Sequence, residues 1–271
     1  MIIQRIEDKN DERISLFYTK RESSLKNIPN YENGLFVAES SLVINRALDK
    51  SYEPICFLVV EEKVDEFNDI FNRCDKNIVV YEASEEIFKT LKGYILIKGI
   101  LCLFKRKKEK TISEVINNKR RIVVLEEVVN PTNVGTIFRN AAALFADGVL
   151  LTNDSCDPLY RRSIRVSMGN VFNINYTFVD RNKYIELLKQ NGYKIVSFAL
   201  RNNSIDINDE ILNNEKKLAI VFGSEGYGLS QDTINNSDYI VKIPMNNNVD
   251  SLNVAACSGI ALWQLCKNNI K

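Results

Sequence analysis

Three segments of the chain combine amides, glycines and charged side chains at spacings that could serve a chemical reaction. The first, residues 130–140, reads NPTNVGTIFRN. We expect a helix to begin near its start, with Thr132 or Asn133 as the N-cap. Arg139 then lies one helical turn beyond Gly135 on the same face, so that an amide, an open helix start and a guanidinium converge. An ordinary capped helix with a surface arginine explains this segment equally well when it is taken alone.

The second segment, residues 220–230, reads IVFGSEGYGLS and places three glycines directly after an apolar run. Such glycines permit a tight turn in which a ligand contacts bare backbone, and Glu225 stands at its apex. The segment is neither the G-x-G-x-x-G pattern nor a phosphate loop, because no Lys-Ser or Lys-Thr pair ends it. A ligand-binding turn is favoured over a structural one, since a structural turn needs one or two glycines and no carboxylate.

The third segment, residues 243–256, reads IPMNNNVDSLNVAA. Pro244 is expected to end a strand, the asparagines suit a turn, and Ser251 is a candidate N-cap for a last helix. Small residues between positions 255 and 261 would let that helix pack closely against its neighbours. Taken alone, this segment is better explained as a helix in a core.

The sequence contains no histidine, which restricts the possible chemistry. Ser-His-Asp triads, Cys-His dyads, H-E-x-x-H zinc sites and histidine general bases are all excluded. The six cysteines include no C-x-x-C pair, so neither a disulfide framework nor a zinc site is indicated, and we expect no metal. The reaction must use carboxylates, Arg, Lys, amides, hydroxyls or a cofactor.

Composition and charge predict a compact protein whose basic residues are concentrated in local patches. The chain of 271 residues is 45% hydrophobic and 26% charged, close to the averages for globular proteins. Its net charge is +1, so any affinity for nucleic acid must come from local basic runs. Residues 105–110 (KRKKEK) form one run, which suits a linker or a phosphate contact equally well. A second run comprises Arg161, Arg162 and Arg165.

The apolar segments give the expected location of the protein. No stretch approaches the roughly 18 apolar residues of a membrane span. The N-terminal MIIQRIEDKN lacks the apolar core of a signal peptide. We therefore expect a cytoplasmic protein with no membrane partner.

The apolar pattern predicts two α/β domains, residues 1–108 and 109–271. In the first, strands are expected at 34–39, 55–60, 78–81 and 99–104, with helices at 41–48 and 85–91. In the second, a short helix is expected at 113–118, strands at 122–125, 148–151, 175–179, 194–199, 218–222 and 239–243, and longer helices near 134–145 and 251–266. That alternation implies a parallel sheet, whose ligands bind beyond the carboxyl ends of its strands.

Taken together, the three segments resemble the signature motifs of the SpoU (TrmH-like) family of RNA ribose methyltransferases, within the SPOUT superfamily. The patterns N-P-x-N-V-G-x-x-x-R-x-A, G-S-E-G-x-G-L-S and I-P-M followed by S-L-N-V occur in the family's order and spacing over about residues 123–261. Residues 157–171 resemble the region between the motifs, and residues 34–42 (GLFVAESSL) resemble the family's substrate-binding domain. Ser40 stands where a glycine is usual, and residues 246–248 and Asp250 also depart from the pattern.

The resemblance implies a fold, an assembly and a cofactor. The fold is a C-terminal parallel-sheet α/β domain with a deep trefoil knot, plus a small N-terminal α/β substrate-binding domain, and the family is dimeric. The cofactor is S-adenosylmethionine, held largely by backbone. Its carried-over binding residues are Ala199, Leu200, Gly223, Ile243, Met245 and Leu252. The carried-over catalytic and substrate-facing residues are Asn133, Arg139, Glu225, Ser251 and Asn253.

The predicted reaction is transfer of a methyl group from S-adenosylmethionine to a ribose 2′-hydroxyl of structured RNA. It needs in-line alignment and removal of one proton, without a metal or redox centre. The family proposal makes the residue at Arg139 a general base, yet arginine side chains keep their proton in proteins. We favour Arg139 as a phosphate clamp that stabilises the developing alkoxide, with the proton passing to substrate phosphate. Ser251 and Asn253 would orient the ribose, and the arginines at 161, 162 and 165 would grip RNA.

The resemblance also leaves alternatives open. Ribosomal RNA is preferred over transfer RNA as the substrate, because the additional N-terminal domain resembles those of ribosomal RNA enzymes. A transfer RNA 2′-O-methyltransferase is the first alternative. A non-catalytic RNA-binding or ribosome-assembly protein on the same scaffold is the second, although it would need neither Arg139 nor the S-L-N-V sequence. A nicotinamide oxidoreductase is disfavoured, because no G-x-G-x-x-G pattern follows an expected strand.

Overall fold

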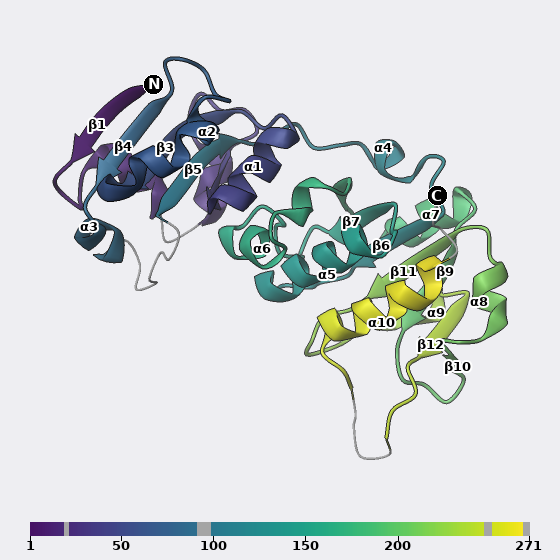
Figure 1. The fold of residues 1–271 in the computed structure, drawn as a ribbon. Helices are drawn as coiled ribbons and strands as arrows, with labels where there is room; N and C mark the ends of the chain where they lie inside the picture. Colours follow the sequence, from purple (N-terminus) through teal and green to yellow (C-terminus); the bar gives the residue numbers. More distant parts are fainter. Residues whose placement is uncertain (19–21, 91–98, 247–250, 268–271) are drawn as a thin grey trace. The chain divides into compact units, whose positions relative to one another are not determined.

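The computed structural model describes residues 1–18, 22–90, 99–246 and 251–267. The chain forms two compact units, each built around its own sheet (Figure 1). The N-terminal unit comprises Met1–Glu109 and Leu159–Phe172, and the C-terminal unit comprises Lys110–Pro158 and Asn173–Lys271. Leu91 of the expected helix 85–91 and the motif departures at positions 247, 248 and 250 lie outside the described residues.

The N-terminal unit is built on a five-stranded mixed sheet with the order β1-β4-β3-β5-β2. Its strands are β1 (Ile2–Ile6), β2 (Leu35–Glu39), β3 (Pro54–Val60), β4 (Val79–Ala83) and β5 (Ile100–Lys105). The central strands are almost continuously apolar and buried, which is why they form the core of the sheet. Its helices in the described part of residues 1–109 are α1 (Ser41–Asp49), α2 (Asn68–Phe71), α3 (Glu85–Thr90) and three 3-10 segments, Glu12–Phe17, Glu22–Asn27 and Glu61–Phe67.

A segment from later in the sequence completes the N-terminal unit. It contains α6 (Arg161–Val166) and a 3-10 turn at Asn170–Phe172. The ring of Phe172 lies 5.6 Å from that of Phe36 and 5.0 Å from that of Tyr52, measured between centroids. These aromatic contacts hold residues 159–172 in this unit. The apolar pattern of the sequence instead predicted two continuous domains, with these residues in the second one.

The C-terminal unit contains a seven-stranded sheet with the order β10-β12-β9-β11-β6-β7-β8, in which every pairing is parallel. Its strands are β6 (Arg121–Leu125), β7 (Gly148–Thr152), β8 (Tyr176–Val179), β9 (Lys194–Phe198), β10 (Ile205–Asp206), β11 (Leu218–Phe222) and β12 (Tyr239–Lys242). Its helices in the described ranges are α4 (Ile112–Ile116), α5 (Pro131–Ala143), α7 (Tyr184–Gln190), α8 (Glu210–Asn214), α9 (Gln231–Asn235) and α10 (Val254–Cys266). The central strands β6 and β11 are buried along their whole length, as expected for a parallel sheet covered on both faces.

The expected α/β fold with a parallel sheet is confirmed, and each strand expected from the sequence is present within two residues. The predicted helix caps are wrong. Asn130 caps α5 by accepting from the Thr132 amide, in place of Thr132 or Asn133. Helix α10 is capped by Asn253 and not by Ser251, because the Asn253 side chain accepts from the first free amides of the helix.

The described helices and side chains also bear on membrane and metal binding. None of the described helices combines the length and the hydropathy that a membrane crossing requires. Among the same residues, His, Cys, Asp and Glu side chains form no group of three that could hold a metal ion.

Ser40 adopts a backbone conformation that favours glycine, the residue usual at this position in the resembled family. It is buried, with φ of 79° and ψ of 147°, and its side chain makes no capping hydrogen bond to α1. Replacing Ser40 with Gly should relieve this strain and stabilise the fold by about 1 kcal/mol. The measurement is the free energy of unfolding in urea.

Ser40→Ala is the matched control for that experiment, since it removes the hydroxyl but keeps the Cβ atom that causes the strain. It should leave the free energy of unfolding unchanged or lower it. Equal stabilisation by Ala and Gly would show that the hydroxyl, and not the backbone conformation, is at fault.

Candidate functional site

The glycine-rich loop at residues 223–230 closes on itself immediately after β11. The Ser224 amide donates to the Gly228 carbonyl at 3.2 Å, and the Gly228 amide donates back to the Ser224 carbonyl at 3.0 Å. Gly223 lies where this turn closes, so that an added Cβ atom would lie 2.5 Å from the Leu229 nitrogen. The glycine at 223 is therefore required by the close approach of the two limbs of the loop.

A chain of hydrogen bonds joins the three segments that the sequence singled out. Asn253 donates from Nδ2 to Oδ1 of Asn133 at 3.3 Å, and Asn133 donates from its own Nδ2 to the Glu225 carboxylate. Asn133 is only 6% exposed, whereas Glu225 is exposed at the loop apex. The buried amide thus connects the first helical turn of α5 with the glycine loop and with the cap of α10.

Arg139 lies on α5, six residues after Asn133, which is about 9 Å along a helix axis. Its side chain is exposed and forms no hydrogen bond or ion pair with the residues that the structure describes. A guanidinium of this kind can bind an anionic group of a ligand without first breaking an internal ion pair.

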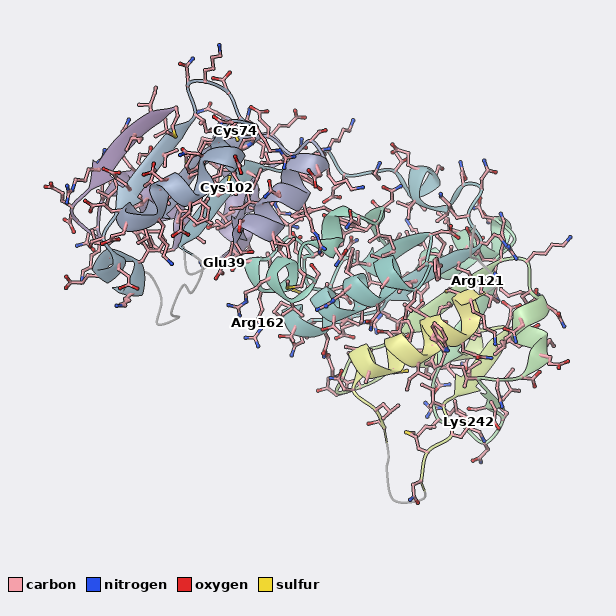
Figure 2. All side chains as sticks on the ribbon, viewed as in Figure 1. Glu39, Cys74, Cys102, Arg121, Arg162 and Lys242 are labelled. Atoms are coloured by element: carbon pink, nitrogen blue, oxygen red, sulfur yellow. The ribbon has the colours of Figure 1, made fainter. Side chains whose placement is uncertain are left out.

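A cavity of about 280 Å³ lies beyond the carboxyl ends of β9 and β12. Its wall includes Arg201, the glycine loop at residues 227–229, Lys242 (Figure 2) and Cys257. Five of the six residues predicted to bind a cofactor line it, namely Ala199, Leu200, Ile243, Met245 and Leu252, and so does Ser251, predicted to be catalytic. The sixth, Gly223, is not part of the wall, but it determines the position of the backbone at 228 and 229.

The cavity wall suits an organic ligand with apolar parts. Leu200 and Leu252 remain 46% and 37% exposed, so an apolar group in the cavity would bury surface that is otherwise in water. Burial raises the pKa of the Cys257 thiol to about 12, which keeps it protonated at neutral pH. The combination of bare backbone and apolar side chains fits the adenosine portion of S-adenosylmethionine and the methylene groups beside its sulfonium centre.

The three arginines predicted to bind RNA differ in their surroundings within the N-terminal unit. Arg161 is held by Glu39, with Nη2 3.2 Å from the carboxylate and a side chain only 18% exposed. Its backbone amide also donates to Glu22 at 2.6 Å. Arg162, which projects from α6 in Figure 2, and Arg165 are both exposed. Arg161 therefore has a structural ion pair in place of a free guanidinium.

The expected basic run at residues 105–110 is also partly committed to contacts inside the N-terminal unit. Lys105 pairs with Glu53, and Lys107 lies 4.8 Å from the centroid of the Tyr52 ring. The Arg106 Nε donates to the Leu35 carbonyl at 2.9 Å. The first half of the run is therefore held against the N-terminal unit at the end of β5. These contacts favour neither of the two expected roles, a linker or a phosphate contact.

Glu126, a fully buried carboxylate next to the site, was not predicted from the sequence. It follows β6 directly, and its side chain accepts hydrogen bonds from Ser230, Tyr184 and Thr233. The only available signal was its position in the run LEEVV, where one of two adjacent glutamates directly ends a buried strand.

Comparison with known proteins identifies a protein family whose model matches this chain. Residues 120–263 match the SpoU rRNA Methylase family. An uncharacterized tRNA/rRNA methyltransferase of Mycobacterium tuberculosis is 30% identical over 266 residues, covering 97% of this chain and 91% of that protein. The Bacillus subtilis 23S rRNA (guanosine(2553)-2'-O)-methyltransferase is 24% identical, covering 97% and 99% of the two chains.

Solved structures with the same fold cover nearly the whole chain. An AdoMet-bound rRNA methyltransferase from Sinorhizobium meliloti superimposes with a TM-score of 0.84 at 21% identity, covering 99% of each chain. A structure described as an RNA 2'-O ribose methyltransferase has a TM-score of 0.78 at 25% identity, covering 97% of this chain and 98% of its own. Both units thus have counterparts in these structures.

Replacing Gly223 with Ala should destabilise the C-terminal unit by about 1–3 kcal/mol, because the added methyl group would meet backbone and not a movable side chain. Gly226→Ala is the matched control, since nothing lies within 4 Å of a Cβ atom at that position of the same loop. Urea unfolding of both variants is the measurement. Equal stability of the two variants would contradict the proposed close approach at Gly223.

Proposed function

Because the chain belongs to the SpoU rRNA methylase family, we propose that it methylates a ribose 2′-hydroxyl of structured RNA. It is an S-adenosylmethionine-dependent RNA methyltransferase. The observation that carries the proposal is the hydrogen-bonded chain from Asn253 through Asn133 to Glu225, next in sequence to the residues that line the cavity. Ribose is the proposed acceptor because positioning of a neutral hydroxyl needs amides, hydroxyls and a cation, which this site supplies.

The cavity residues would hold the cofactor largely through backbone and apolar contacts. Ala199, Leu200, Ile243, Met245 and Leu252 are the residues that we assign to this role. S-adenosylmethionine supplies an electrophilic methyl group on a sulfonium centre. The described site offers no metal cluster and no thiolate, so the chain's own contribution is alignment of the acceptor and stabilisation of charge.

The polar residues of the site would orient the acceptor and stabilise the charge that develops on it. Ser251, which lines the cavity, and Asn253 would orient the ribose, while Asn133 fixes Asn253 and the loop apex relative to each other. Arg139 would bind a substrate phosphate and stabilise the alkoxide that develops on the 2′-oxygen. The proton of the 2′-hydroxyl would pass to a phosphate of the substrate and not to Arg139, because guanidinium groups keep their proton in proteins.

Ribosomal RNA is the proposed substrate class. The similarity of the whole chain to a bacterial 23S rRNA 2′-O-methyltransferase supports it, and so does the presence of an N-terminal unit beside the catalytic one. The exposed Arg162 and Arg165 of α6, three residues apart on one helix face, are the proposed RNA phosphate ligands of that unit. An enzyme of this function would act in the cytoplasm, where ribosomal RNA and the methyl donor meet in bacteria.

The proposal includes a homodimer and a trefoil knot, both features of the family that the motifs resemble. Trp263 and Ile260 support the dimer, because they are 65% and 43% exposed and three residues apart on one face of α10. Apolar side chains grouped in this way are typical of a surface covered by a partner. Sedimentation of the wild-type chain at micromolar concentration measures its oligomeric state, and a monomer would remove the dimer from the proposal.

Replacing Arg139 with Ala should lower the methyl transfer rate by on the order of 100- to 1,000-fold, since it removes one stabilising cation from the transition state. The assay uses S-adenosylmethionine and ribosomal RNA from cells lacking the protein, with mass spectrometry of nuclease digests to detect 2′-O-methyl nucleosides. Because Arg139 is not part of the cavity wall, the affinity for S-adenosylmethionine should stay unchanged.

Three results would count against the proposal, one each from that assay, from the same assay with transfer RNA as substrate and from a titration with S-adenosylmethionine. Transfer to transfer RNA alone would replace the substrate class. Absence of S-adenosylmethionine binding by the wild-type chain would favour a non-catalytic RNA-binding protein. Full activity of the Arg139→Ala variant would remove this residue from the mechanism.

The double variant Arg162→Ala, Arg165→Ala should bind RNA more weakly and with a shallower salt dependence. Loss of two phosphate contacts lowers the slope of log affinity against log salt by about 1.4 to 1.8. Lys183→Ala, Lys189→Ala is the control, because both lysines are exposed on the C-terminal unit and their loss changes the net charge equally. If the two double variants weaken RNA binding equally, the loss results from the change in net charge and not from phosphate contacts of α6.

A further inference from the structure

Glu126 is a charged side chain with no exposure to solvent, and it is completely engaged by hydrogen-bond donors. Its Oε1 accepts from the Ser230 amide at 2.7 Å, and its Oε2 accepts from the hydroxyls of Tyr184 at 2.8 Å and Thr233 at 2.5 Å. Arg181 adds a cation, with Nη2 3.5 Å from Oε1. A buried carboxylate is tolerated in a protein only when donors and counter-charge of this kind replace water.

The donors show what Glu126 holds in place. Ser230 is the last residue of the glycine loop and the N-cap of α9, where its Oγ accepts from the Thr233 amide at 3.2 Å. Residues 227–229, immediately before Ser230, form part of the cavity wall. Glu126 therefore fixes the point at which the returning limb of the loop joins α9.

The backbone around Glu126 leads into the other half of the site. The Glu126 amide donates to the Phe222 carbonyl at 2.9 Å, next to the start of the glycine loop. Glu127 has a φ of 56°, and its amide donates to Thr152 Oγ1 at 3.0 Å, while the Val128 amide donates to Ser155 Oγ at 3.2 Å. This rigid connection runs directly into Asn130 and α5, which carries Asn133 and Arg139.

We propose that Glu126 is a positioning residue that holds the glycine loop in the conformation that binds S-adenosylmethionine. The proposal rests on the proposed function, because it concerns the same cavity. Glu126 is not among the residues that line the cavity, so it acts through Ser230 and the loop and not by contact with the cofactor. Without its acceptor atoms, the Ser230 amide and two buried hydroxyls would lose their partner, and the loop would populate other conformations.

The first test compares two buried tyrosines of the C-terminal unit that each lose one hydroxyl. Tyr184, 1% exposed, donates to Glu126, whereas Tyr193, 2% exposed, donates to the carbonyls of Ile116 and Lys119. Both Phe variants should unfold at lower temperature. Only Tyr184→Phe should weaken the binding of S-adenosylmethionine, measured by titration calorimetry, because only Tyr184 is linked to the loop.

The second test uses Glu126→Gln, which keeps the side-chain volume and one acceptor for Ser230 but removes the charge facing Arg181. If the binding conformation of the loop falls to about one tenth of the population, the dissociation constant for S-adenosylmethionine rises about 10-fold. Hydrogen exchange of the amides at 224–230 in the absence of any ligand should accelerate in this variant and not in Tyr193→Phe. Unchanged affinity in both Glu126→Gln and Tyr184→Phe would overturn the proposal.

The exchange measurement separates this proposal from the proposed function. A wild-type chain that binds no S-adenosylmethionine would refute the proposed function and, with it, the role of Glu126 in cofactor binding. Faster exchange in Glu126→Gln would then still assign the loop's conformation to Glu126. Unchanged exchange would show that the loop is held without this carboxylate, which also overturns the proposal.

Discussion

The parallel sheet of the C-terminal unit is the constraint on which the site depends. Because every pairing is parallel, β6, β9, β11 and β12 all end at the same edge, and the segments that follow them meet there whatever their separation in sequence. The buried amide of Asn133 then fixes their relative positions. It is hydrogen-bonded to the segment after β11 through Glu225 and to the segment after β12 through Asn253.

Two buried charged groups, Arg121 and Glu126, add further rigidity, and each is hydrogen-bonded to several partners. Arg121, labelled in Figure 2, is 1% exposed and donates to the carbonyls of Leu265, Lys216 and Glu215. Burial lowers the pKa of its guanidinium, yet these carbonyls tie the end of α10 to the edge of the sheet opposite the site. Arg121 at the start of β6 and Glu126 directly after its end thus connect both ends of this strand to neighbouring segments through buried side chains.

The strands could be predicted well because the buried strands are continuous apolar runs in the sequence, as in IVVL of β6 and LAIVF of β11. Strand β1 was missed because Ile2 and Ile3 are both half-exposed at the edge of the sheet, so the run MIIQRI has neither pattern. The caps were misplaced because each motif offers several capping side chains. Helix α5 begins at Pro131, so Thr132 and Asn133 lie inside its first turn and Asn130 is the residue that caps it.

Side chains whose partners come from distant parts of the sequence were the hardest to predict. In the sequence, Glu126 cannot be distinguished from a surface glutamate, because its partners Tyr184 and Thr233 are far away along the chain. In the same way, Arg161 cannot be distinguished from the neighbouring arginines, because its partner Glu39 is distant in sequence. Helical periodicity does not separate the arginines, because Arg161 and Arg162 lie four and three residues from Arg165, so that both are its neighbours on the helix surface. The ion pair with Glu39 distinguishes Arg161 from the other two arginines, and it could not be predicted because the two residues are 122 positions apart in the sequence.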